Sequence, residues 1–252
     1  YKMIDINVWT GYWNTLIVKG DVETVRRTVQ AYGVAQIFMA PLDAAWCPDP
    51  HLYNEVVYKA SDRYDDIFPV PIIDPTLPTW QKELNRAAAC TGVRLIKLLP
   101  GYGGYDLSKT DDFFTSVCEA KLGVMIQVRI DDPRHQHPLA QAPDVPASSI
   151  AAVAERHPDV TIIIGGASTS TIHALKEQLI TLPNLHADTS QLDGLDAIKI
   201  LVEDSLLPKL IYGSHAPLFM PAPSIARILN DLDDESAMKI MRGNGERILN
   251  YD

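Results

Sequence analysis

The chain has 252 residues, and its 22 lysines and arginines against 32 aspartates and glutamates give a formal net charge of −10. This acidic balance argues against a nucleic-acid-binding protein, which needs a basic face to meet phosphates. Hydrophobic residues make up 46% of the chain, which is enough for a sizeable core and too much for a disordered protein. No apolar run approaches the roughly 18 residues of a membrane span. We therefore expect neither a nucleic acid nor a membrane as a partner.

The three cysteines, Cys47, Cys90 and Cys118, are few, odd in number and far apart. Their spacing fits neither a disulfide framework nor a paired-cysteine metal site. Because free cysteines are typical of reducing compartments, this usage predicts a cytoplasmic protein.

Eight short apolar runs, rich in β-branched residues, recur along the chain. Near-continuous runs of this kind are typical of parallel strands that are covered on both faces. They predict strands at Met3–Val8, Ala35–Met39, Val70–Ile73, Arg94–Leu98, Val124–Val128, Thr161–Gly165, Asn184–Ala187 and Leu210–Gly213.

Segments with helical periodicity separate these runs. In the clearest of them Asp21 is a candidate cap, Val25 and Val29 lie on one stripe, and Gly33 follows as a stop. Thr110 is the candidate cap of another helix. Further helices are predicted over Ser148–His157 and Gln191–Leu206, and one or two closing helices over Glu235–Asn250.

The pattern is a βα unit repeated eight times, at about 31 residues per unit, close to the size of a (β/α)8 barrel. Alternation of this kind predicts a parallel sheet, and eight units close into a barrel. An open doubly wound sheet is the main alternative, but no glycine-rich fingerprint follows the first strand. We therefore predict an α/β protein, a single TIM-barrel domain over residues 1–252.

In such barrels the active site lies at the carboxyl ends of the strands. Polar or aromatic side chains that end the predicted strands are Asn7, Trp9, Lys97, Gln127, Arg129, Asp188 and His215. Three long or proline-rich connections rise from the same rim, at 40–50, 129–146 and 216–223, and loops of this kind are usually lids or binding loops. The second of them carries Arg134 and His137.

Several of these residues predict an anion-binding mouth. Lys97, Arg129 and Arg134 are cations on an acidic chain, and a basic mouth on an acidic body focuses anions. A guanidinium such as that of Arg129 can hold a carboxylate through two parallel hydrogen bonds. We expect a small carboxylate-bearing substrate, with Arg129, Arg134, Trp9, His137 and Asp188 as its binding residues.

The other residues are candidates for catalysis. Asn7 and Gln127 can donate amide hydrogens to a carbonyl oxygen on which charge develops. His215 is a candidate acid or base near neutral pH, and Lys97 is a second cation or, if desolvated, a base or an imine-forming amine. The alternative is that these polar groups satisfy one another as a structural network in a filled barrel mouth.

Five motifs then occur in an order that resembles one family. Met3–Gly11 is similar to the family's opening Ile-Asp-x-His-x-His strand, and Arg94–Pro100 is similar to its Gly-x-Lys-x-His-Pro strand. His157–Ile164 is similar to the run before its isolated histidine. Ile211–Pro217 is similar to its Phe-Gly-Thr-Asp-x-Pro segment, and Gly243–Leu249 is similar to its closing Gly-Asn-Ala-x-Arg-Leu helix. The chain therefore resembles the amidohydrolase superfamily, in the branch of small barrels that includes decarboxylases, lactonases and metal-dependent hydrolases.

The metal ligands that the resemblance implies are missing. The family uses paired histidines on strand 1, one histidine each on strands 5 and 6, and an aspartate on strand 8; here Asn7, Trp9, Gln127, Gly166 and His215 stand there. Indole and glycine offer no ligand, and amides are feeble zinc ligands. We therefore expect no metal and no cofactor. The alternative is one divalent metal such as Zn, held by His135 and His137 with His215, Asp188 or Asp74.

These observations together predict an amidohydrolase-like hydrolase, or a carbon–carbon lyase such as a decarboxylase, that acts on a small anionic carbonyl substrate without the usual metal. The alternatives are a catalytically inactive binding protein that kept the barrel and an enzyme with an unconventional metal site. Scattered aromatic residues leave a homodimer open as well.

Overall fold

The computed structural model describes residues 2–249 of the chain. Eight strands lie within these residues, seven of them overlap the predicted ones, and each pairs in parallel with at least one neighbour in sequence. The strands are β1 (Met3–Thr10), β2 (Val34–Pro41), β3 (Ile67–Pro69), β4 (Leu95–Leu98), β5 (Gly123–Gln127), β6 (Ile162–Gly165), β7 (Leu185–Asp188) and β8 (Leu210–Ile211).

The third strand differs from the prediction, because β3 ends at Pro69 while Val70–Ile73 was expected. The predicted segment still runs beside β4, since Ile72 forms an isolated parallel bridge with Lys97. Proline has no amide hydrogen for a ladder. Pro69 and Pro71 therefore interrupt the regular strand at this point without removing it from the wall of the barrel.

The strands close into a barrel. Regular pairing gives two sheets, β1-β2-β3 and β4-β5-β6-β7-β8. The Ile73 amide donates to the Lys97 carbonyl at 3.1 Å and so joins the first sheet to β4, while the His215 amide donates to the Asn7 carbonyl at 2.9 Å and joins β8 to β1. The prediction of a TIM barrel is confirmed, and the open sheet is excluded.

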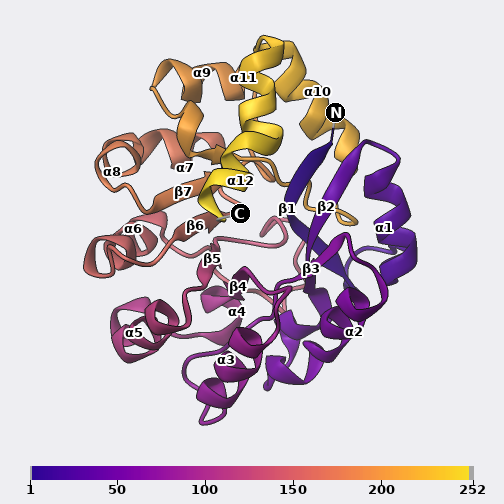
Figure 1. Ribbon diagram of the computed structural model, residues 1–252, viewed down its shortest axis with the longest axis vertical. Coiled ribbons are helices and arrows are strands. Elements are labelled where there is room, and N and C mark those ends of the chain that lie inside the picture. The colour runs from indigo at the N-terminus through magenta and orange to yellow at the C-terminus, as the bar shows by residue number, and fades with distance from the viewer. Residues whose placement is uncertain (1, 250–252) are drawn as a thin grey trace.

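Most helices form the outer layer of the barrel, outside the ring of strands, whereas α12 lies across one end of the ring (Figure 1). They are α1 (Val22–Gln30), α2 (Glu55–Arg63), α3 (Trp80–Ala89), α4 (Pro100–Gly103), α5 (Asp111–Ala120), α6 (Ala147–Arg156), α7 (Thr169–Ala174), α8 (Lys176–Thr181), α9 (Ala197–Glu203), α10 (Pro221–Asp231), α11 (Asp234–Met238) and α12 (Asn244–Ile248). The predicted closing helices are α11 and α12, with a π-helical turn between them, and Asn250 lies outside the described residues.

Helix ends show where local signals hold and where they do not. The Asp21 carboxylate caps α1 by accepting a hydrogen bond from the Thr24 amide at 2.9 Å, as predicted. Thr110 precedes α5 but caps nothing, because its hydroxyl donates to the Leu107 carbonyl instead. The helix predicted from residue 191 begins only at Ala197, because Asp196 adopts a left-handed backbone with φ of 53°.

Apolar side chains fill the amino-terminal half of the barrel. Ile4, Leu95 and Ile163 are fully or almost fully buried there, together with Ile248 and Leu249 at the end of the chain. A second, larger cluster packs the outer face of the strands against the helices. Because the amino-terminal half is closed by hydrocarbon, polar side chains inside the barrel gather at the carboxyl ends of the strands.

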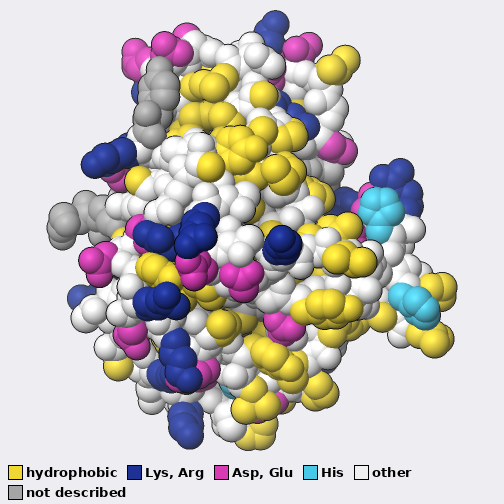
Figure 2. Space-filling view, turned by 90° about the vertical axis from the view of Figure 1, so that its right-hand side faces the viewer, with side chains coloured by type: hydrophobic (Ala, Val, Ile, Leu, Met, Phe, Trp, Pro, Cys, Tyr) yellow, Lys and Arg dark blue, Asp and Glu magenta, His cyan; other side chains and the backbone are white. Residues whose placement is uncertain are grey.

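The outer surface over α1 and α2 carries cations beside anions, with hydrophobic side chains among them (Figure 2). Arg27 pairs with Glu23 on α1, and Lys59 pairs with Glu55 on α2. Exposed pairs of this kind stabilise a protein by about 0–1 kcal/mol each, so this face is a solvated surface. Within residues 2–249, no helix combines the length and the apolarity that crossing a membrane requires.

Candidate active site

A chain of hydrogen bonds at the carboxyl ends of the strands has Asn7 of β1 at its centre. The ammonium of Lys97 on β4 donates to Asn7 Oδ1 at 2.6 Å. Asn7 Nδ2 donates to Asp188 Oδ2 on β7 at 2.6 Å and to Gln127 Oε1 on β5 at 3.2 Å. Four predicted site residues therefore meet, from four strands. All four are at most 2% exposed, so the cluster is sealed from solvent in this conformation.

Burial controls the charges of this cluster. It lowers the pKa of Lys97 to about 7, while the carboxylates of Asp188 and Asp5 pull the other way. It raises the pKa of Asp188, against hydrogen bonds from Asn7 and the Gly166 amide. The Lys97 ammonium also lies 3.7 Å from the centre of the Trp9 ring, a cation–π contact that favours its charged form.

His215 has a single tautomer that its partners determine. The Trp9 indole is a donor only, and it donates to His215 Nδ1 at 3.2 Å. His215 Nε2 therefore carries the hydrogen and donates to the Ile130 carbonyl at 2.7 Å. Burial lowers the pKa of His215 to about 4, so the imidazole is neutral at pH 7. Both ring nitrogens are engaged in holding the rim, which leaves neither of them facing a ligand.

Gly166 stands where the resembled family has its strand-6 histidine, and the structure shows why no side chain fits. Its φ is 67°, in the left-handed region that favours glycine. A Cβ there would lie 2.3 Å from Gln127 Nε2. The Gly166 amide instead donates to Asp188 Oδ1 at 2.9 Å, so this position orients a buried carboxylate through its backbone.

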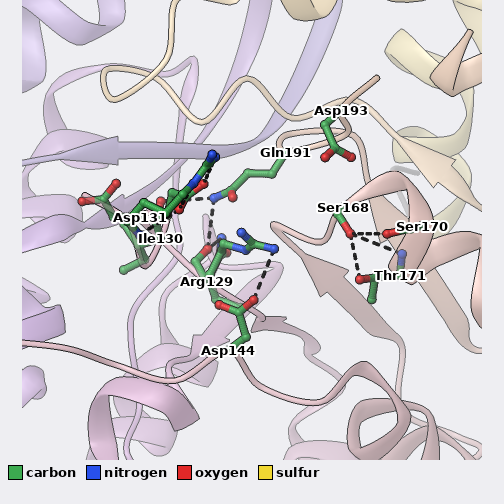
Figure 3. Close-up of polar contacts among 12 residues, drawn as sticks. Arg129, Ile130, Asp131, Asp144, Ser168, Ser170, Thr171, Gln191 and Asp193 are labelled. Carbon is green, nitrogen blue, oxygen red and sulfur yellow. Dashed lines mark hydrogen bonds and ion pairs between the residues drawn. The ribbon is translucent and has the colours of Figure 1, made fainter. Parts of the chain in front are cut away.

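A cleft of about 580 Å³ opens above the sealed cluster. Its lining comes from the loop after β5, the ends of β6, β7 and β8, and α10. Arg129 pairs with Asp144 at 3.2 Å, and Figure 3 shows its guanidinium directed toward that carboxylate. Arg134 pairs with Asp132 and its side chain is 84% exposed. The expected basic mouth is therefore largely neutralised by these acidic partners.

Arg227 of α10 is the exception among the cleft arginines. It donates to the Leu192 carbonyl, and within residues 2–249 it has no ion pair with a carboxylate. Arg227 is not among the predicted site residues, because those residues end strands and Arg227 lies in a helix. No signal in the sequence distinguishes this arginine from those on the outer helices.

Ser190 and Gln191 connect the cleft to the buried cluster, and both line the cleft. Ser190 Oγ accepts a hydrogen bond from Asn7 Nδ2 at 3.3 Å. Gln191 Nε2 donates to the carbonyls of Arg129 and Ile130 at 3.1 Å each, and Figure 3 shows its side chain reaching toward this segment. These two residues separate the cluster from solvent.

The remaining predicted residue, His137, does not join the site. It is exposed, and its Nδ1 accepts a hydrogen bond from the Leu139 amide within the loop after β5. Trp9 is fully buried, so it forms part of the wall around Lys97 and has no surface for a ligand in this conformation.

Comparison with solved structures finds related barrels at low sequence identity. The 5-carboxyvanillate decarboxylase LigW from Sphingomonas paucimobilis superposes with a TM-score of 0.75 and 11% identity, over 100% of this chain and 99% of that one. A 2,6-dihydroxybenzoate decarboxylase complexed with 2,6-dihydroxybenzoate gives a TM-score of 0.73 and 15% identity, over 98% of each chain. At such identities the likeness establishes the fold. No curated protein sequence matches the chain.

The same comparison corrects the expectation that no cofactor is involved. A 5-carboxyvanillate decarboxylase from Novosphingobium aromaticivorans, with a TM-score of 0.72 and 16% identity over 90% of this chain and 79% of that one, is complexed with manganese and 4-hydroxy-3-methoxy-5-nitrobenzoic acid. The expectation that no metal or cofactor is involved is therefore contradicted by a similar barrel that holds manganese.

The side chains at the family's ligand positions do not fit such an ion as they are arranged here. Asn7 Oδ1 accepts from an ammonium at 2.6 Å, and Gln127 Nε2 donates to the Arg129 carbonyl at 2.7 Å. Among residues 2–249, no three histidine, cysteine, aspartate or glutamate side chains come close enough together to hold a metal. The proposed set of His135 and His137 with His215 is thus not assembled, and the described residues give no place for the manganese of the related structures.

The sequence profile of the amidohydrolase family matches residues 15–251, which is nearly the whole chain. The barrel and the similar solved structures agree with that match, whereas the family's metal ligands at the strand ends are replaced. The chain belongs to the amidohydrolase family.

Proposed function

We propose that the protein is a carbon–carbon lyase that removes carbon dioxide from a small carboxylate bound in the cleft. Similar solved structures include two kinds of decarboxylase, which supports this reaction over hydrolysis. The main support in this chain is Arg227, the cleft arginine that lacks a carboxylate partner among the described residues. Arg227 lines the cleft, and a guanidinium suits the planar fork of a substrate carboxylate.

Decarboxylation breaks the bond between the carboxyl carbon and the substrate carbon, and the electron pair of that bond remains on the substrate. Carbon dioxide leaves, and a proton must then be added to the carbon. In the proposed mechanism Lys97 holds that proton, because burial brings its pKa to about 7. His215 was the predicted acid, but its pKa of about 4 leaves it without a proton to give at pH 7.

Delivery of the proton requires Asn7 to turn aside. Its amide is bonded to the Lys97 ammonium on one side and to Ser190, which lines the cleft, on the other. In this proposal Asn7 and Gln127 hold the lysine in place between turnovers, and Asp188 keeps the electrostatic balance of the buried cluster. The amide roles predicted for Asn7 and Gln127 at a substrate carbonyl remain predictions.

The proposed reaction is tested by measuring the release of carbon dioxide from a panel of hydroxybenzoates and short aliphatic carboxylates. Each assay is run with and without added manganese, because a similar structure holds that ion. Arg227→Gln should lower kcat/KM by about 10- to 100-fold, the loss of one or two charge-assisted hydrogen bonds. Arg27→Gln on the exposed face of α1 is the matched control, and equal kcat/KM in the two variants would reject Arg227 as the anchor.

A binding protein without catalysis is the second candidate, and the complete burial of Asn7, Lys97 and Asp188 favours it. It predicts carboxylate binding that depends on Arg227, with no turnover of any compound and no effect of Lys97→Met on affinity. Turnover that falls in Lys97→Met at unchanged KM would exclude it.

The cytoplasmic location stays part of the proposal. Its support is that Cys47, Cys90 and Cys118 are all free in the structure, as is usual in a reducing compartment.

A further inference from the structure

An apolar pocket adjoins the cleft on its outer side. It has a volume of about 470 Å³ and is lined mainly by Trp13, Leu16, Ile130, Leu218 and Phe219. The cleft and this pocket share part of their lining, namely Asp131, His135, Leu218 and Phe219. They are therefore two lobes of one depression, and a ligand bound in one lobe continues into the other.

The two lobes differ in chemistry. The cleft lobe is polar, since arginines, including Arg227, line it together with four serines and three aspartates. The outer lobe is mainly apolar, with two aromatic and three aliphatic side chains. Trp13 and Ile130 are almost fully buried, so they form a fixed floor, while Leu16 and Phe219 are about half exposed and form the walls. A ligand with an anionic head and an apolar tail matches both lobes at once.

Asp131 lies at the junction of the lobes, and its charge is engaged by the protein. Its Oδ2 accepts hydrogen bonds from Trp13 Nε1 at 3.2 Å and from the Thr15 hydroxyl at 2.9 Å. Its Oδ1 lies 3.6 Å from His135 Nδ1. These donors direct the carboxylate toward the walls, so it fixes the floor of the outer lobe and leaves the passage between the lobes open to an anionic ligand.

We propose that the protein binds carboxylates that carry an apolar group of roughly six to eight carbon atoms, with the carboxylate at Arg227 and the apolar group in the outer lobe. This inference rests on the proposed function for its carboxylate end and names the part of the substrate that does not react. Burial of each additional methylene contributes about 0.8 kcal/mol, which is close to a fourfold gain in affinity.

Titration calorimetry with acetate, butyrate, hexanoate and octanoate tests the proposal. We expect Kd to fall about threefold to fourfold per added methylene until the outer lobe is full. Leu16→Ser should flatten this dependence while acetate binding stays unchanged, because Leu16 lines only the outer lobe, and Phe219→Ser should flatten it as well. Both side chains are partly exposed and lie on different segments, so at least one variant is expected to fold. Ile180→Ser on the exposed side of α8 is the control.

The outcomes separate the two proposals. Equal affinity for acetate and octanoate would overturn the apolar lobe and leave the carboxylate site at Arg227 standing. A chain-length dependence in Arg227→Gln with no loss of affinity for any of the four acids would support the lobe and overturn the carboxylate anchor. Failure of every compound to bind would overturn both proposals. Loss of the chain-length dependence in the control Ile180→Ser, as well as in Phe219→Ser, would also overturn both.

Discussion

Asp5 is a buried carboxyl group whose ionisation opposes folding. Its Oδ1 accepts hydrogen bonds from the Ser214 amide at 3.0 Å and the Asn7 amide at 3.2 Å, while its buried Oδ2 has no hydrogen-bond partner. Burial raises the pKa of Asp5 to about 6, well above its ordinary value of 3.8. Asp5→Asn keeps the accepting oxygen and removes the charge, so it mimics the protonated carboxyl at every pH.

The pKa values determine the sign and size of the effect. Between the two values the folded protein keeps a proton on Asp5 that the unfolded chain has lost, so wild-type stability falls as pH rises through this window. At 1.36 kcal/mol per pKa unit, the loss is about 3 kcal/mol in total. The Asp5→Asn variant does not lose this stability, because asparagine does not ionise. The free energy of unfolding of Asp5→Asn minus that of the wild type should therefore rise by about 2 kcal/mol between pH 4 and pH 7.

Urea unfolding at half-unit pH steps measures this difference. The opposite titration of His215, whose lowered pKa makes the protein lose stability as pH falls from 6.5 to about 4, is present in both proteins and cancels in the difference. Asp62→Asn, which removes one carboxylate at an exposed position on α2, is the matched control. A flat or falling difference for Asp5→Asn would refute the argument that burial dominates the ionisation of Asp5.

Three further substitutions test the rim and the cluster by the same urea assay. Trp9→Phe leaves His215 Nδ1 buried without its donor and should cost about 1–3 kcal/mol; a smaller loss would mean that another donor takes the place of the indole. Gly166→Ala forces a methyl against Gln127 at a positive φ and should cost at least about 1–3 kcal/mol, and an undiminished midpoint would contradict the need for glycine. For Lys97→Met, the wild type should gain stability relative to the variant as pH rises from 7 to 10, because the folded lysine loses its proton near pH 7 and the unfolded one near 10.5. A difference independent of pH would show that burial does not control this lysine.

The sequence was sufficient for the barrel, because the signals for it are local. Apolar runs of strand length alternate with amphipathic segments, and both patterns depend on residues close together in the chain. The same reasoning placed Asn7, Lys97, Gln127 and Asp188 at strand ends, and these four side chains do meet. Where a local signal competed with another contact, as at Thr110, the predicted cap did not form.

Only the tertiary structure determines the solvent exposure, the charge state and the contact partners of the site residues. Residue type shows that Lys97 and His215 carry titratable groups, but their pKa values follow from burial and from partners on other strands. The cations predicted at the mouth are mostly neutralised by carboxylates of the loop after β5, and Arg227, which has no carboxylate partner within residues 2–249, comes from a helix. Periodicity along a chain predicts which way a side chain faces. The electrostatic environment of that side chain depends on charged and polar neighbours from other strands, and only closure of the barrel brings these neighbours within a few ångströms.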